Sequence, residues 1–295
     1  MADVLSLLSQ RTVAGFGDVD PWVAVAALGE IAETINWWGG WCAGPLEDPA
    51  VIAALRPMAA RVARSAGCRW WGAGIDRRAQ QYVQWPDDDY EPEAFRAAEV
   101  LRLVSAEAIE SERGTSRYLH LPAGEGPGGH WWSNPWPCVI STTRRLPGLA
   151  AVLLAGREDG FGEREAGVRP AAVAAKARVY EIAEPAAWQR LVTRYPRTAT
   201  ATYRHNWAWT GWDGEWLLPD WPAVASDWDG VHLSVTGYLS TAGRLLPVGP
   251  ARTLLAKWNP DETYWLADVI TLGAPQAWHS PSGGPLGWTM RKPLS

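Results

Sequence analysis

The sequence predicts an α+β protein, in which an N-terminal helical region packs on a C-terminal region with a mixed or antiparallel β-sheet and short helices. Residues 1–120 carry apolar side chains at helical spacing, and two aspartate–proline pairs stand where helices would begin. Residues 130–295 carry short apolar runs without the regular strand–helix alternation of a doubly wound sheet. The segment 121–130, rich in glycine and proline, is expected to link the two regions.

Three helices are expected in the N-terminal region. The first begins at Asp20-Pro21, where the acid can cap the helix and the proline fits its first turn. The second repeats this arrangement over 48–67, and Pro57 is expected to kink or split it. The third, over 92–114, has the strongest helical pattern in the chain.

The C-terminal region is expected to form strands with two short helices between them. Short apolar segments that alternate with polar residues are typical of strands. The expected strands lie at 138–142, 150–156, 177–182, 230–239, 251–258 and 262–270. The expected short helices lie at 184–196 and 220–228, and each opens with an acid and a proline.

The overall composition is that of a globular protein. Of the 295 residues, 47% are hydrophobic and 20% are charged, and the net charge is −5. This balance gives no electrostatic case for binding nucleic acid or an anionic membrane. No apolar run reaches the ~18 residues of a membrane helix, and the N-terminus, with its acid at Asp3, does not resemble a signal peptide. We therefore expect a cytoplasmic protein, and the arginine-rich, lysine-poor composition indicates a bacterial source.

The three cysteines and the histidines do not have the spacing of a metal site. Cys42, Cys68 and Cys138 are far apart and form no C-x-x-C motif, which favours free buried thiols in a reducing compartment. The histidines form no H-x-H, H-x-x-x-H or H-E-x-x-H pattern. We therefore expect no metal site.

Tryptophan is the unusual component, with 21 tryptophans against three phenylalanines. Many of them cluster beside glycine, at 36–41, 69–74, 130–137 and 206–216. Aromatic stacking that fixes loops, a flat-walled pocket for a sugar, base or other planar ligand, and an exposed partner-binding patch all fit this pattern. Within the last cluster, Trp209 and Trp212 follow a histidine and are our candidates to flank a ligand.

The stretch 227–243 offers the first candidate for catalysis. If 231–236 is a strand, His232 lies on its polar face together with Ser234 and Thr236, away from the aliphatic residues. Asp229, three residues earlier, is a candidate to orient the imidazole of His232. His232 would then act as general base or acid.

A second group of candidates is expected to lie around His232 and Asp229. His205 and Tyr203, in the stretch 202–207, are expected to polarise or position a substrate in the same cleft. Tyr238 and the acids Asp261 and Glu262 are candidates for substrate binding at its rim. A hairpin turn at 259–262 and hydrogen-bonded structural histidines remain the alternatives.

One pattern resembles ADP-ribosyltransferases of the Arg–Ser-Thr–Glu-x-Glu type. Arg117, the run Ser141-Thr142-Thr143 and the pair Glu163 and Glu165 occur in that order. The resemblance implies NAD as a cofactor, with the arginine on the pyrophosphate and the glutamate stabilising the positive charge that develops on the ribose. A second Ser-Thr run at 240–241, followed by acids at 261–262, fits the same pattern.

Three functions therefore remain open. The first is a protein that binds a small polar or planar ligand in a Trp-lined pocket, as an acid–base hydrolase or transferase without a cofactor. The second is an enzyme that resembles ADP-ribosyltransferases and uses NAD. The third is a non-catalytic binding or interaction protein, in which the tryptophans supply the affinity. In each case the expected partner is a small molecule or another protein, and not a nucleic acid or a membrane.

Overall fold

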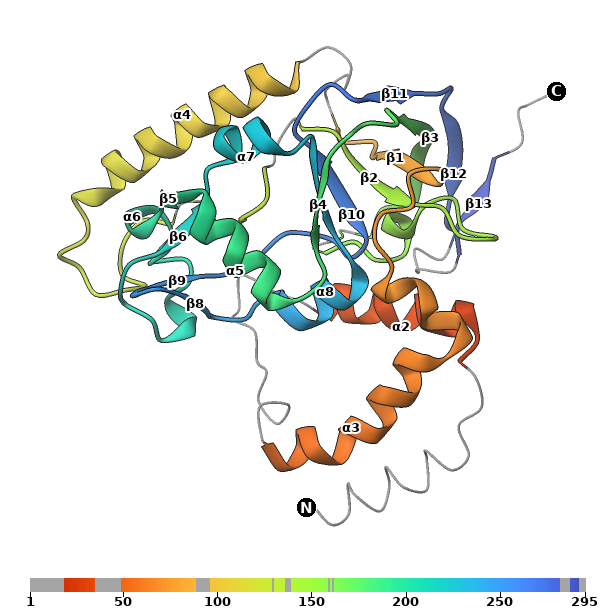
Figure 1. Cartoon of the computed structure of the whole chain (residues 1–295), viewed down its shortest axis with the longest axis horizontal. Coiled ribbons are helices and arrows are strands. Elements are labelled where there is room, and N and C mark those ends of the chain that lie inside the picture. Colours follow the sequence, from red (N-terminus) through yellow and green to blue (C-terminus); the bar gives the residue numbers. More distant parts are fainter. Residues whose placement is uncertain are drawn as a thin grey trace.

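The computed structural model describes residues 19–34, 49–88, 96–128, 130–135, 139–158, 160, 162–281 and 287–291. The predicted α+β class is confirmed: a nine-stranded mixed sheet is combined with helices and two small two-stranded sheets. Figure 1 shows the large sheet on one side of the molecule, and α4 to α7 with the small sheets on the other. Cys42, Cys138, the cluster at 36–41 and the expected helix start at 92 lie outside the described residues.

The strand order of the large sheet is β13-β12-β3-β1-β2-β10-β7-β4, and β11 also pairs with β3. Its strands are β1 (Gln80–Gln84), β2 (Ser141–Arg144), β3 (Glu165–Val173), β4 (Val179–Ile182), β7 (Gly230–Leu233), β10 (Glu262–Trp265), β11 (Ile270–Leu272), β12 (Gln276–His279) and β13 (Thr289–Met290). The β4–β7 pair is parallel and the other pairs are antiparallel. The region expected to be helical therefore also contributes β1, which lies between β3 and β2.

The first two helices begin where the aspartate–proline pairs predict. In α2 (Pro21–Thr34), the Asp20 Oδ1 accepts a hydrogen bond of 2.8 Å from the backbone N–H of Trp22. The helix α3 (Pro49–Arg64) runs through Pro57 as one element, so of the expected kink or split, the split does not occur. A 3₁₀ helix, η2 (Ala66–Gly72), follows, and a Cβ at Gly67 would lie 2.4 Å from the carbonyl oxygen of Val19. Glycine is therefore required where η2 crosses the start of α2.

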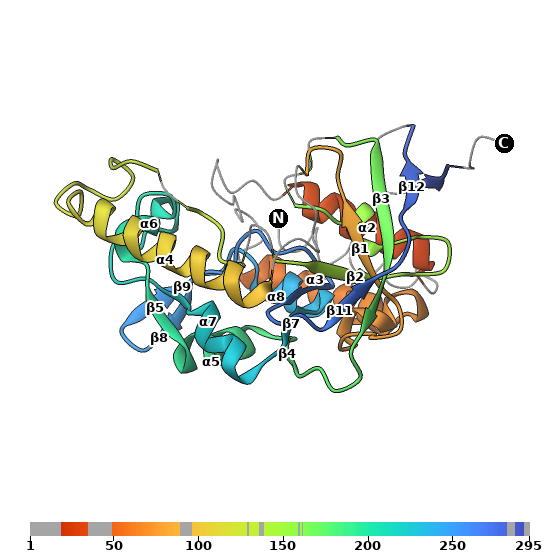
Figure 2. The same cartoon turned by 90° about the horizontal axis from the view of Figure 1, so that it is seen from above.

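The long helix α4 (Ala97–Ser116) joins the two expected regions. Its N-cap residue, Arg96, makes no side-chain capping bond, but Asp268 accepts a hydrogen bond of 2.9 Å from the N–H of Ala97. The helix lies alongside α6 (Thr200–Tyr203) and α7 (Trp221–Asp227), as Figures 1 and 2 show. The N-terminal and C-terminal halves of the chain thus share one interface here. Among the described residues, no helix is both long and apolar enough to cross a membrane.

The remaining elements are short. They are α5 (Pro185–Arg194), α8 (Val235–Thr241), η4 (Val152–Leu154), η5 (Ala208–Thr210), and the strands β5 (Pro196–Thr198), β6 (Leu217–Pro219), β8 (Leu246–Val248) and β9 (Ala251–Thr253). The strand expected at 150–156 is instead the 3₁₀ helix η4. The strand expected at 230–239 ends at Leu233, because the hydroxyl of Ser234 accepts a hydrogen bond of 3.1 Å from Gly237 N–H and caps α8. Ser234 and Thr236 therefore do not share a strand face with His232.

Tryptophans form much of the core. Trp188, Trp207, Trp216, Trp258 and Trp265 are at most 1% exposed. The rings of Trp207 and Trp216 meet edge to face with centroids 4.9 Å apart, and Trp188 and Trp258 meet in the same way at 6.3 Å. This geometry is the favourable one for aromatic pairs. A large part of the tryptophan content is thus structural.

Candidate functional site

His232 lies at the centre of a chain of charged groups that runs across four adjacent strands and is buried except at Glu181. Its Nδ1 is 2.6 Å from the Oε2 of Glu181, which stands directly beside it on β4. Its Nε2 is 3.4 Å from the Oδ1 of Asp261, which immediately precedes β10. Asp261 in turn accepts hydrogen bonds from Arg144, the last residue of β2: 2.6 Å from Nε and 3.0 Å from the backbone N–H.

The two carboxylates decide the protonation state of His232. Burial alone lowers the pKa of this histidine, but the hydrogen bonds and charges of Asp261 and Glu181 outweigh it and hold the pKa above its ordinary value. Both ring nitrogens are engaged, so the geometry favours a positively charged imidazolium. A ring held in this way has no nitrogen left to take a proton from a ligand, which argues for a structural His232.

The charged chain also fastens the loop 73–75 onto the sheet. Arg144 donates a hydrogen bond of 3.0 Å to the carbonyl of Gly74, and the N–H of Ile75 donates one of 3.0 Å to Glu181. A Cβ at Gly74 would lie 3.0 Å from the Glu181 carboxylate, so the loop lies directly over that carboxylate. Asp261 itself has a φ of 59°, a left-handed conformation that is unfavourable for a residue other than glycine.

Asp229 does not orient His232. It accepts a hydrogen bond of 2.7 Å from the N–H of Arg178 and lies 3.5 Å from the guanidinium of the same residue. The reason is geometric: in extended backbone, residues three positions apart are separated by about 10 Å, so the side chains of Asp229 and His232 cannot meet. The expected Asp229–His232 pair is therefore wrong, and Glu181 and Asp261 hold the histidine instead.

His205 lies against the predicted linker. Its Nδ1 accepts a hydrogen bond of 3.0 Å from the N–H of Gly126, where a Cβ would lie 2.1 Å from the ring. Burial, with the charge of Arg204, lowers the pKa of His205. The described contacts therefore place His205 and His232 in separate surroundings.

The other candidate residues are distributed over several packed regions. The Trp212 ring lies under the Arg252 guanidinium at 4.4 Å, and its Nε1 donates to the carbonyl of Glu215 at 3.1 Å. Trp209 is half-buried against the main core, and Tyr238 is buried in it. Trp209, Trp212 and Tyr238 do not line either of the two cavities described below.

Glu262 points away from the His232 chain. It accepts hydrogen bonds of 3.0 Å from Asn259 N–H and 2.9 Å from its side-chain amide, and burial raises the pKa of this carboxyl. Asp261 and Glu262 are both buried, at 1% and 2% exposed, so neither forms an exposed rim.

The residues that resemble the ADP-ribosyltransferase pattern are separated in space. Arg117 is the C-cap of α4, with its guanidinium over the ring of Tyr118. Glu165 opens β3 and pairs with Arg291 at 2.5 Å, while Glu163 pairs with Arg157. The α4 helix, which ends beside α6, and β3 lie on opposite sides of the molecule in Figures 1 and 2.

A different set of side chains surrounds a cavity of about 170 Å³ between α4, α7 and the segment 130–134. Its walls are mainly aromatic and apolar, with a histidine, an acid and an arginine among them. The lining residues are Val104, Glu107, Ala108, His130, Trp132, Ser133, Asn134, Arg197, Tyr203 and Trp221. Of these lining residues, only Tyr203 was named individually as a candidate from the sequence.

His130 and Trp132 form one wall of this aromatic cavity. Their rings are stacked, with centroids 4.5 Å apart and an angle of 27° between the planes. The His130 Nε2 is 3.8 Å from a carboxylate oxygen of Glu107 on α4. Burial lowers the pKa of His130; Glu107 opposes this shift and the charge of Arg197 adds to it. His130 is therefore neutral at pH 7, and its ring keeps both a donor and an acceptor nitrogen.

Tyr203 and Trp221 close the cavity from the C-terminal half. The Tyr203 hydroxyl donates a hydrogen bond of 2.8 Å to the carbonyl of Trp132, and burial raises the pKa of Tyr203 to about 12. The phenol therefore stays neutral. Trp221 is 6% exposed and opens α7. The cavity thus has rigid aromatic walls positioned by α4, α6 and α7.

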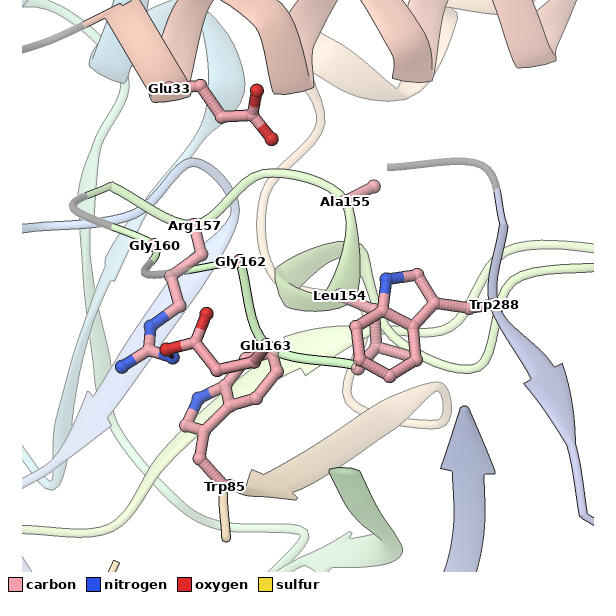
Figure 3. Close-up of a pocket in the computed structure, with 9 residues that line it drawn as sticks. All are labelled: Glu33, Trp85, Leu154, Ala155, Arg157, Gly160, Gly162, Glu163 and Trp288. Carbon is pink, nitrogen blue, oxygen red and sulfur yellow. Dashed lines mark hydrogen bonds and ion pairs between the residues drawn. The ribbon is translucent and has the colours of Figure 1, made fainter. Parts of the chain in front are cut away.

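A second, smaller cavity of about 50 Å³ lies between the end of α2, the 3₁₀ helix η4 and described residues of the segment 155–163, which follows η4. Figure 3 shows Arg157 and Glu163 side by side next to Trp85, with Glu33 of α2 on the opposite side and Trp288 beside Leu154. The Arg157 guanidinium is 4.4 Å from the centre of the Trp85 ring and forms an ion pair with Glu163. Its charged groups are thus largely matched within the protein, and its volume is small for an organic ligand.

Comparison with known proteins adds no functional information. No known protein family matches the chain, and neither a curated protein nor a solved structure is similar to it. Only the geometry and chemistry of the site therefore bear on its function.

Proposed function

We propose that this protein binds a small, planar, polar ligand in the aromatic cavity beside His130. The observation that carries the proposal is a cavity of about 170 Å³ whose walls combine Trp132, Tyr203 and Trp221 with His130, Glu107 and Arg197. Apolar walls with a few convergent polar groups are typical of small-molecule sites. The proposal keeps the expected Trp-lined pocket but moves it away from Trp209 and Trp212.

The size of the cavity limits the ligand to about one ring. An apolar cavity of ~150 Å³ accommodates benzene, so a slightly larger one takes a single ring with one small substituent. The stacked His130 and Trp132 rings present flat surfaces that suit a planar partner. A ligand of about nine non-hydrogen atoms at ~0.5 kcal/mol per atom would bind with a Kd of roughly 0.5 mM.

The polar groups of the cavity would fix the orientation of the ring. Neutral His130 can donate or accept a hydrogen bond, Glu107 can accept one, and Arg197 can donate several. These groups stand on different elements, since Glu107 belongs to α4 and Arg197 to β5. A ligand with polar atoms at its edge would therefore contact both walls at once.

A cavity-filling variant tests the proposal. Binding of phenol, benzamide, benzoate and uracil at up to 10 mM would be measured by saturation-transfer NMR with the full chain. We expect at least one of them to bind, and we expect Ala108→Leu to abolish this binding because the new side chain occupies the cavity. Ala106→Leu, on the exposed face of the same helix, is the matched control and should bind as the wild type does.

Two outcomes would contradict the proposal. One is that none of the four compounds binds to the wild-type protein. The other is that a compound binds equally well to the Ala108→Leu protein, because the ligand would then lie elsewhere. Thermal unfolding of both variants checks that they fold, and filling a cavity is expected to leave stability unchanged or raised.

A further inference from the structure

Arg197 forms no ion pair with a carboxylate among the residues that the structure describes, unlike the buried arginines Arg144 and Arg204. Buried Arg144 pairs with Asp261, and buried Arg204 donates to Asp213 at 2.8 Å. Arg197 is half-buried at the centre of β5 and lines the aromatic cavity together with Tyr203. A half-buried guanidinium at a cavity wall without a carboxylate partner retains most of its capacity to bind an anion.

The nearby acids have other contacts. Both carboxylate oxygens of Glu112 accept hydrogen bonds from α6: one from the N–H of Ala201 at 2.7 Å, the other from the N–H and hydroxyl of Thr202 at 2.9 Å each. Glu107 lies toward His130, and its side chain is 69% exposed, so solvent screens its charge. The described acids near the cavity thus leave the Arg197 guanidinium without a carboxylate partner.

We propose that the ligand of the aromatic cavity is a small planar carboxylate, whose carboxylate group pairs with the Arg197 guanidinium and whose ring lies against Trp132 and Trp221. This inference rests on the proposed function and names its ligand class. A planar guanidinium matches a carboxylate with two parallel hydrogen bonds, which a neutral amide or an ammonium group cannot reproduce. The hydrogen bond between Tyr203 and the carbonyl of Trp132 helps to fix the aromatic wall beside this arginine.

Three ligands that share one ring test the charge preference without any mutation. Benzoate, benzamide and benzylamine are titrated into the full-length protein by isothermal calorimetry at low and at moderate salt. We expect benzoate to bind at least tenfold more tightly than benzamide, since it can form two parallel hydrogen bonds to the guanidinium and each charge-assisted bond is about twice as strong as a neutral one. We expect benzylamine to bind more weakly than benzamide, because Arg197 repels its ammonium group.

Variants of Arg197 then test whether this residue causes the preference for a carboxylate. Arg197→Gln should lower the affinity for benzoate at least tenfold and change that for benzamide less than threefold, and Arg197→Lys should restore part of the loss. Arg194→Gln is the matched control, because Arg194 lies three residues earlier, pairs with Asp227 and does not line the cavity. The thermal unfolding of each variant is measured first, and Arg197→Lys replaces Arg197→Gln if the glutamine variant does not fold.

The outcomes separate this inference from the proposed function. Equal binding of benzoate and benzamide, or preference for benzylamine, would overturn the carboxylate inference and leave a ligand pocket in place. A benzoate preference that persists in Arg197→Gln would overturn the role of this arginine. Failure of all three compounds to bind would overturn the proposed function, and the carboxylate inference with it.

Discussion

Replacing His232 with glutamine should destabilise the protein by an amount that depends on pH. The imidazolium is 1% exposed and lies between two carboxylates, so its loss leaves negative charge uncompensated inside the protein. Breaking a buried ion pair costs about 3–5 kcal/mol. In the variant, Asp261 would still pair with Arg144, and solvent would screen Glu181, whose side chain is 37% exposed. We therefore expect the free energy of unfolding to fall by about 3 kcal/mol, near the lower limit of that range. The midpoint of thermal unfolding would fall by roughly 6 °C.

The direction of the pH dependence follows from the raised pKa of His232. Because the folded pKa lies above the unfolded value of about 6.5, the stabilisation is fully present below pH ~6.5 and is lost as the pH rises through the folded pKa. Circular dichroism melts of wild type and His232→Gln between pH 5.5 and 9 measure it. The difference between the two proteins should be largest at the acidic end and shrink with rising pH.

His205→Gln is a control of opposite sign. The pKa of His205 is lowered by burial, so the stability that this residue contributes is present above pH ~6.5 and lost as the pH falls. Its difference from wild type should therefore grow with pH. If the difference in stability between wild type and His232→Gln stayed constant or increased with pH, His232 would not be a positively charged group held between Glu181 and Asp261.

Five further substitutions test the packing and the helix ends. Trp216→Ala should lower the free energy of unfolding, measured with denaturant, by about 3–5 kcal/mol because the ring is fully buried. Trp212→Ala should lower it by about 1 kcal/mol, because the half-exposed ring mainly loses a cation–π contact. Equal losses would refute the assignment of the core. Asp268→Ala should cost about 1 kcal/mol by removing the cap of α4, and an unchanged urea midpoint would show that the cap is unimportant. Gly237→Ala should destabilise the protein by about 2 kcal/mol or more, since the new Cβ would lie 2.0 Å from a backbone carbonyl oxygen. Gly114→Ala should stabilise it by ~0.5 kcal/mol, because Gly114 lies within α4 and a Cβ there would meet no other atom. The reverse order of the two melting temperatures would contradict both predictions.

Local chemistry explains which elements the sequence predicted. The aspartate–proline pairs at 20–21 and 48–49 act through the first turn of a helix, so neighbouring residues suffice to place α2 and α3. The strand β1 was missed because five residues within a helical context take their place in the sheet from β2 and β3, both far away in sequence. At Ser234, alternation of apolar and polar residues predicted a continuing strand, but the capping hydroxyl begins a helix.

The candidate site depends more strongly on contacts between distant residues. His232 was expected to pair with Asp229, but its carboxylate neighbours are Asp261 and Glu181. Glu181 lies 51 residues away, and only the parallel pairing of β4 with β7 brings it close. The cluster 130–137 indicated stacked aromatics, and the His130–Trp132 pair has that geometry. Arg197 gave no signal in the sequence, because its lack of a carboxylate partner is a property of the folded neighbourhood.

The central claim, that a planar ligand binds in the aromatic cavity, is tested most directly by the imidazole resonances of the histidines. The chain has five histidines, so their Hε1 signals can be resolved in a carbon-correlated NMR spectrum and assigned by single replacements. Titration with benzoate is predicted to shift the His130 signal in a saturable way, because the ligand ring would lie beside the stacked His130 and Trp132, while His205 and His232 stay unchanged. A saturable shift at His232 or His205 with none at His130 would contradict the claim and return the site to the place where the sequence first put it.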